Sequence, residues 1–159
     1  MRETIYLLLG SNMGNSLLTL EAALARIGKL GSIHKTSAYY KTKAWGNISQ
    51  PDFINQVIAL QTIMTPIDLM TALQQIEKDL GRVRGEKWGP RLIDIDILFY
   101  GERIIKEANL EIPHPRIVQR RFTLVPLVEI ASDFLHPVTL KTMVELLAQC
   151  SDGLEVARI

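Results

Sequence analysis

The sequence predicts an α+β sandwich of the split β-α-β type, in which helices pack on an antiparallel sheet. Apolar runs of strand length and apolar stripes of helical spacing follow the order strand, helix, strand, strand, helix, strand, and a hairpin and further helices are appended. Glycines and turn residues mark the ends of most of these segments. The 159 residues are 47% hydrophobic and contain no repeat, linker or low-complexity stretch. We therefore expect one domain over residues 1–159.

The first half of the chain is predicted to contain three strands and one helix. Residues 5–9 form a compact apolar run that ends in a Gly-Ser-Asn turn, which is typical of a buried strand. Asn15 or Ser16 can cap a helix that runs to about residue 30. A strand is expected over 33–41, and a long strand over 53–64 after a loop.

The second half is predicted to begin with a helix that Thr65 caps and Pro66 opens. This helix ends at Gly81, and an apolar strand over 92–100 follows. Shorter segments complete the prediction: a turn at 101–102, a hairpin through 103–105 and 110–112, a helix over 122–130, and a last helix after a capping box at 142–145.

Composition excludes several functional classes. The formal net charge is +1, so no global field favours nucleic acid or an anionic membrane. The single cysteine, Cys150, rules out an internal disulfide framework. The apolar run near the start is too short for a signal peptide or a membrane span. We expect a cytoplasmic protein that has neither nucleic acid nor membrane as a partner.

The predicted strand over 92–100 carries two aspartates that could bind a cation. Asp94 and Asp96 point to the same face because side chains alternate along a strand, and their Cα atoms are roughly 6–7 Å apart. Two carboxylates this close repel each other, and a hard cation such as Mg²⁺ between them relieves that repulsion. The alternative is a half-exposed strand whose charges face solvent. The opposite face is wholly apolar and is predicted to be core: Ile93, Ile95, Ile97 and Phe99.

Two basic clusters could supply ligands for an anion. The first comprises Arg82, Arg84, Lys87 and Arg91, directly before the aspartates, and the second comprises His114, Arg116, Arg120 and Arg121. Arginine suits phosphate through its planar fork, and no Walker A or Gly-x-Gly-x-x-Gly motif is present to bind nucleotide in another way. The clusters could act on one anion only if they meet in space. Otherwise each cluster is a charged surface exposed to solvent.

Polar and aromatic residues elsewhere are candidates for a planar ligand. Asn55, in the middle of an apolar strand, could pair with the amide edge of a heterocycle or could satisfy backbone groups. Phe53, on the same face, could stack on a ring or belong to the core, and the same two interpretations apply to Phe122 and Trp45.

A family resemblance makes these candidates specific. Residues 81–100, GRVRGEKWGPRLIDIDILFY, resemble the signature of 6-hydroxymethyl-7,8-dihydropterin pyrophosphokinase, an enzyme of folate biosynthesis, and WGPRLIDIDIL is its most specific part. Matching segments occur along nearly the whole chain: LLLGSN (7–12), YYKT (39–42), QPDFINQV (50–57), IPHPR (112–116) and RRFTLVPL (120–127). The fold of that family is ferredoxin-like, which agrees with the predicted order of elements.

The resemblance implies a reaction and its residues. ATP would donate its β,γ-diphosphate to the hydroxymethyl group of the pterin and release AMP, and the enzyme would act as a monomer. Two Mg²⁺ ions would bind Asp94 and Asp96, and Arg82 and Arg91 would stabilise charge on the transferring group. The implied ATP-side residues are Gln74, Glu77, Arg84, Trp88, Arg91, Ile97, His114 and Arg120. The implied pterin-side residues are Thr42, Trp45, Phe53, Asn55 and Phe122, with the two phenylalanines on either side of the ring.

The chain departs from the family pattern at several positions, none of them in the aspartate pair. Phe53 stands where tyrosine is common, Lys43-Ala44 replaces a frequent proline pair, and Pro115 replaces a tyrosine. The segment 82–91 is one residue shorter than in some relatives, so no role is carried over to Lys87. Two other functions stay open from sequence. One is another Mg²⁺-dependent phosphoryl transferase, and the other is an RNA-binding module, although the RNP1 pattern is missing.

Overall fold

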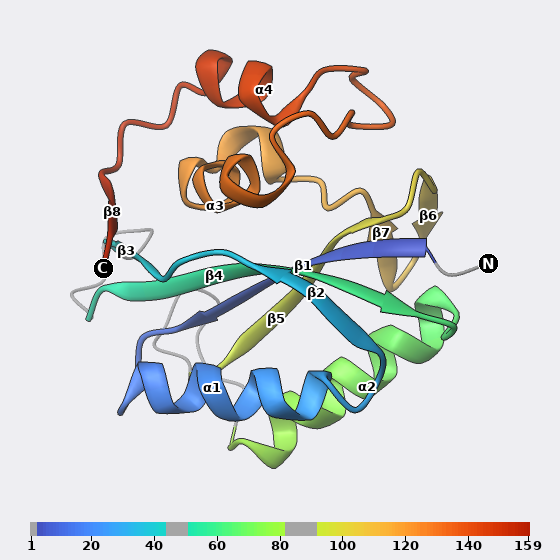
Figure 1. The fold of residues 1–159 in the computed structure, drawn as a ribbon, viewed down its shortest axis with the longest axis vertical. Helices are drawn as coiled ribbons and strands as arrows, with labels where there is room; N and C mark the ends of the chain where they lie inside the picture. Colours follow the sequence, from blue (N-terminus) through green and yellow to red (C-terminus); the bar gives the residue numbers. More distant parts are fainter. Residues whose placement is uncertain (1–2, 44–50, 82–91) are drawn as a thin grey trace.

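The computed structural model describes residues 3–43, 51–81 and 92–159 of the chain (Figure 1). In these ranges a six-stranded sheet has the strand order β5-β1-β4-β3-β8, and β2 also pairs with β4. Every pairing is antiparallel. The strands are β1 (Glu3–Ser11), β2 (Ser32–Thr36), β3 (Tyr40–Thr42), β4 (Phe53–Thr62), β5 (Asp94–Tyr100) and β8 (Val156–Arg158). The predicted α+β class with an antiparallel sheet is confirmed.

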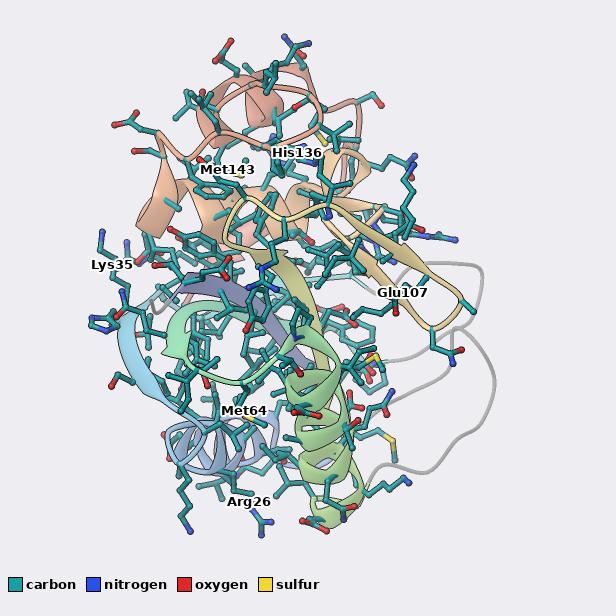
Figure 2. The ribbon with its side chains drawn as sticks, turned by 90° about the vertical axis from the view of Figure 1, so that its right-hand side faces the viewer. Arg26, Lys35, Met64, Glu107, His136 and Met143 are labelled. Carbon is teal, nitrogen blue, oxygen red and sulfur yellow. The ribbon has the colours of Figure 1, made fainter. Side chains whose placement is uncertain are left out.

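Helices cover both faces of the sheet (Figure 1). The helices α1 (Ser16–Ile27) and α2 (Pro66–Asp79) lie on one face, and α3 (Arg121–Ala131) and α4 (Met143–Gln149) lie on the other. Each layer encloses its own apolar core. Figure 2, turned by 90°, shows Met143 and His136 in the α3/α4 layer and Met64 on the α1/α2 side. No helix in the described part of the chain is long and apolar enough to cross a membrane.

The predicted helix starts are confirmed in detail. Asn15 Oδ1 accepts a hydrogen bond from Leu18 N at 3.2 Å, and Thr65 Oγ1 accepts one from Asp68 N at 3.2 Å. Thr142 and Glu145 form the reciprocal capping box at the start of α4. Each cap stabilises its helix by about 1 kcal/mol, because it satisfies an amide that has no partner inside the helix.

The strand predicted over 33–41 is in fact two strands, β2 and β3. Ser37 separates them: its N–H donates to Val57 O at 2.8 Å, while its Oγ accepts from Val57 N at 3.0 Å. Ala38 N then turns away from the sheet and donates to the carboxylate of Glu129 on α3 at 3.1 Å. The Ser37 hydroxyl thus takes the place of a backbone carbonyl as the acceptor for Val57 N, and the strand is interrupted at this residue.

The alternation predicted for 92–100 is wrong at Phe99. Ile97 pairs with Leu7 and Phe99 pairs with Tyr6, so Leu98 is an extra residue that forms a β-bulge. The bulge turns Phe99 into the α3/α4 core, away from Ile93, Ile95 and Ile97, which lie in the α1/α2 core as predicted.

The remaining differences concern the ends of elements and short segments: β1 is longer at both ends than the predicted 5–9, and β4 ends two residues before the predicted 64. The helix α1 ends at Ile27 rather than near residue 30, and the appended hairpin is formed by β6 (Ile105–Glu107) and β7 (Leu110–Ile112). A 3-10 turn, η1 (Ile117–Gln119), and the strand β8 were not predicted.

Candidate active site

Three strands bring the predicted site residues to one face of the sheet. In the register of the sheet, Gly10 on β1 lies opposite Asn55 on β4 and, on its other side, opposite Asp94 on β5. Residues that lie directly opposite in an antiparallel pair share a face. Asn55, Gly10 and Asp94 therefore form a row across the sheet, and neighbouring strands about 4.8 Å apart place Asn55 and Asp94 roughly 10 Å apart. The row joins the predicted pterin side to the predicted metal side.

The lack of a side chain at Gly10 leaves room for the side chain of Asn55. A Cβ atom built on Gly10 would be 2.6 Å from Asn55 Oδ1 and 3.9 Å from Phe53 Cδ1. The sequence predicts a turn at Gly10, whereas β1 continues to Ser11 and the glycine lies inside the strand. A glycine within a strand often marks the close approach of another group, and this signal could have identified it.

The other described pterin-side residues surround this row. Thr42 pairs with Phe53, so both belong to the same sheet face as Asn55. Thr42 is 2% exposed, and within the described ranges its Oγ1 has no hydrogen-bond partner. Phe122, in the first turn of α3, packs against the core on this side of the sheet. Phe53 on the sheet and Phe122 on the covering helix thus lie on the same side of the sheet.

Asn12 fixes the entry to the strand that carries Phe53. Its Nδ2 donates to Pro51 O at 3.1 Å, across 39 residues of sequence, and the side chain is 2% exposed. No role for Asn12 could be predicted from the sequence, because only the fold brings the end of β1 beside the start of β4.

The aspartates lie on β5, at the edge of the sheet. Asp94 and Asp96 are each partly exposed on the same face, as predicted. Their strand is held from outside by Glu77 on α2, whose Oε2 accepts a hydrogen bond from Ile95 N at 2.8 Å. In the described ranges no strand pairs with this side of β5, and the contact gives the Ile95 amide an acceptor there. Glu77, 5% exposed, therefore positions the residue between the two aspartates.

Loss of this contact should destabilise the protein measurably. Glu77→Ala leaves the buried amide of Ile95 unsatisfied, and we expect the free energy of unfolding to fall by about 1–3 kcal/mol. Glu77→Gln keeps an acceptor oxygen and should lose less. Denaturant unfolding of both variants measures the difference. The control is Gln75→Ala, which removes an exposed 2.8 Å hydrogen bond from the same helix. An equal loss in Glu77→Ala and Gln75→Ala would refute the role given to Glu77.

His114 lies beside the aspartate strand as a neutral hydrogen-bond donor. Its backbone N–H donates to Leu98 O at 3.0 Å, and its Nδ1 accepts from Arg116 N at 3.2 Å. The proton of the neutral ring must then be on Nε2. Burial, together with the charges of Arg120 and Arg116, lowers the pKa of His114 to about 4. At neutral pH the ring can therefore offer an N–H to an anion without carrying charge.

This lowered pKa predicts how stability depends on pH. Between about pH 6.5 and 4 an unfolded His114 takes up a proton that the folded one does not. The unfolded state then binds more protons, so stability must fall as the pH is lowered through this window. His114→Gln removes this contribution, and its free energy of unfolding, measured without ligands, should fall less steeply than that of the wild type. His136, whose pKa is also lowered by burial, contributes equally to both proteins. His34→Gln, on an exposed part of β2, is the control, and identical slopes for His114→Gln and the wild type would contradict the prediction.

Arg120 connects this imidazole to the pterin side. Its guanidinium carbon lies 5.4 Å from the centre of the Phe122 ring, a cation–π distance. The charge of Arg120 also acts on His114. The structure therefore places His114 next to the aspartate strand, and the charges of Arg116 and Arg120 act on it.

Several predicted residues are not brought together by the described part of the structure. Gln74 is exposed on α2, and the Ile97 side chain is buried in the α1/α2 core. The following predicted residues lie outside the described ranges: Trp45, Arg82, Arg84, Trp88 and Arg91. Their roles, and the meeting of the two basic clusters, stay predictions.

The sheet face thus carries a partly exposed carboxylate pair and, across Gly10, a buried amide, and a few convergent polar groups of this kind are typical of a site for a small ligand. Comparison with known families identifies the family. Residues 6–132 match the model of 7,8-dihydro-6-hydroxymethylpterin-pyrophosphokinase (HPPK). The chain belongs to this family.

Similar proteins agree with this membership. A 2-amino-4-hydroxy-6-hydroxymethyldihydropteridine pyrophosphokinase of Haemophilus influenzae is 43% identical over 151 residues, which cover 94% of this chain and 94% of that protein. One of Synechocystis is 42% identical over 143 residues, covering 89% of this chain and 73% of that protein. Plasmodium falciparum HPPK-DHPS matches in structure with a TM-score of 0.76 at 18% identity, over 94% of this chain and 45% of that one. This chain thus spans less than half of that solved protein, and the likeness shows the fold alone.

Proposed function

We propose that this chain transfers the β,γ-diphosphate of ATP to the hydroxymethyl group of 6-hydroxymethyl-7,8-dihydropterin, in folate biosynthesis, and that the row Asn55–Gly10–Asp94 is the centre of its active site. Family membership supports the pyrophosphoryl transfer to the pterin. The observation that supports the site is the register of β1, which places the amide and the carboxylate on one face, on either side of a glycine.

The pterin would bind on the β4 side of the row. The Asn55 amide can donate to and accept from the polar edge of a pterin. Phe53 and Phe122 would stack on the two faces of the ring, and Thr42 and Trp45 would complete the pocket. The buried Thr42 Oγ1, which has no partner in the described ranges, is a polar group that a bound ligand could satisfy.

The triphosphate would lie on the β5 side of the row. Asp94 and Asp96 fit a hard divalent cation, because both are carboxylates, both are partly exposed and both share the face that leads to Gly10. We propose two Mg²⁺ ions there; when bound, they would neutralise phosphate charge and lower the pKa of the pterin hydroxyl. His114, through Nε2–H, and Arg120 would orient phosphate oxygens, and Arg82 and Arg91 would stabilise charge on the transferring group.

The nucleotide end of ATP would contact residues around the outer edge of β5. We propose that Ile97 contributes through its main chain, since its side chain is buried in the core. The other proposed ATP contacts are Gln74, Glu77, Arg84 and Trp88. We also propose that the chain is a single domain that acts as a monomer in the cytoplasm.

The test is to mix the protein with Mg-ATP and 6-hydroxymethyl-7,8-dihydropterin and to identify the products. We expect AMP and the pterin diphosphate in equal amounts, and neither when the pterin or Mg²⁺ is omitted. Production of ADP in place of AMP would indicate another phosphoryl transferase. Salt-sensitive retention of RNA without turnover would indicate a binding module.

A further inference from the structure

The last residues of the described chain connect two elements of the proposed pterin pocket. The tail segment, residues 151–159, leaves α4, passes the start of α3, and ends as strand β8 beside β3 (Figure 1). The helix α3 carries Phe122, and β3 carries Thr42. The helix α3 also contacts both β3 and β8.

The first connection is made by Asp152 at the start of α3. Its Oδ2 accepts a hydrogen bond from Arg121 N at 3.1 Å, across 31 residues. Arg120, at the N-cap position, has no side-chain oxygen that could accept from the helix amides. Asp152 therefore acts as a cap from a distant part of the chain, and its other oxygen accepts from Leu154 N at 3.0 Å, which ties the carboxylate to its own segment.

The second connection is the pairing of β8 with β3. Val156 pairs with Thr42 and Arg158 with Tyr40, and Ile159 N donates to Tyr39 O at 3.0 Å. Because opposite residues share a face, Val156 extends the sheet face that carries Thr42 and Phe53. The tail segment thus reaches the pocket face itself and covers the open edge of β3.

A third contact joins α3 to β3 directly. Tyr40 Oη donates to Glu129 Oε1 at 2.6 Å, and the same carboxylate accepts from Ala38 N. Burial and the bond to Glu129 raise the pKa of Tyr40 to about 12, so the phenol remains a donor over the working range of pH. Glu129 is near the end of α3 and Asp152 is at its start, so the helix is tied to β3 near one end and to the tail segment at the other.

We infer that the tail segment sets the gap between α3 and the sheet, and that Asp152 is a positioning residue for the pterin. This inference depends on the proposed assignment of Thr42, Phe53 and Phe122 to the pterin pocket. A ring held between two phenyl groups needs faces at van der Waals separation, so a small shift of α3 weakens binding. Displacements of about 1 Å can cost roughly 100-fold in rate. Arg120 starts from the same turn, but its long flexible side chain can follow a phosphate when the helix shifts.

Steady-state kinetics on the full chain tests the inference. Asp152→Ala removes the cap, and Ala157→Pro disrupts the pairing of β8 with β3. We expect each to raise KM for the pterin about tenfold and to change KM for ATP less than about twofold. Asp152→Asn keeps one acceptor oxygen and should recover part of the loss. Glu155→Ala, an exposed change in the same segment, should behave as the wild type.

The pattern of the kinetic constants distinguishes positioning from simple destabilisation. A merely structural role lowers the folded fraction, which reduces the maximal rate and leaves both KM values unchanged. That pattern in Asp152→Ala and Ala157→Pro would overturn the inference, as would wild-type kinetics in both variants. If the wild type itself shows no turnover of the pterin, the proposed function fails and the inference fails with it. The thermal unfolding curve of each variant, recorded without ligand, gives its folded fraction at the assay temperature.

Discussion

Asp94→Ala and Asp96→Ala are each expected to lower the turnover number by roughly 1000-fold or more, while the protein remains folded. Each change removes a proposed ligand of the cation that accompanies the triphosphate. The fold should survive because both side chains are partly exposed and because one of two neighbouring like charges is lost. Release of AMP measures the turnover, and the melting temperature without ligand measures the fold.

Two controls make this result specific. Glu102→Ala removes an exposed carboxylate just beyond the other end of β5 and should keep wild-type turnover. Mg-nucleotide should raise the melting temperature of the wild type and of Glu102→Ala, and should raise those of the aspartate variants much less. An aspartate variant that retained full Mg²⁺-dependent turnover would be incompatible with the assigned site.

Gly10→Ala is expected to weaken pterin binding by roughly 30-fold or more, with little change in ATP binding. The added Cβ would meet Asn55 Oδ1 at 2.6 Å, a distance that real Cβ contacts essentially never show. Asn55 is 4% exposed, so its side chain has little room to move aside. The amide would rotate away from the position in which we expect it to meet the pterin.

A double-mutant cycle shows whether the effect passes through Asn55. Asn55→Ala should weaken pterin binding by itself, and adding Gly10→Ala to it should have little further effect, because the clashing oxygen is gone. Gly28→Ala is the matched glycine control, since its Cβ would meet no atom closer than 3.5 Å and it lies far along the chain from the proposed site. Additive losses in the Gly10 and Asn55 variants would show that Gly10 acts by another route.

Local patterns predicted those parts of the site that depend on short stretches of sequence. Alternation along one strand placed Asp94 and Asp96 on a common face, and capping residues fixed the starts of three helices. The same alternation was wrong at Phe99, because the bulge at Leu98 arises from the pairing of β5 with β1. The residues directly beside the bulge are apolar, so the sequence pattern does not show where the alternation is interrupted.

Contacts between distant segments were beyond the sequence. The fit of Asn55 over Gly10 depends on the register of β1 and β4, and the bond from Asn12 to Pro51 depends on the same register. The strand β8 is three residues long, too short for its side chains to show a strand pattern, and it is recognised by its pairing with β3. Residue type and position made Asn55 and Phe122 candidates, and the family resemblance implied their roles, but only the fold shows what holds them in place.

A crystal structure with Mg²⁺, a non-hydrolysable ATP analogue and the pterin is the most direct test of the account. We expect the cation on Asp94 and Asp96, and the pterin ring between Phe53 and Phe122 with its polar edge on Asn55. A pterin bound on the α1/α2 face of the sheet, or cations bound away from β5, would contradict the account.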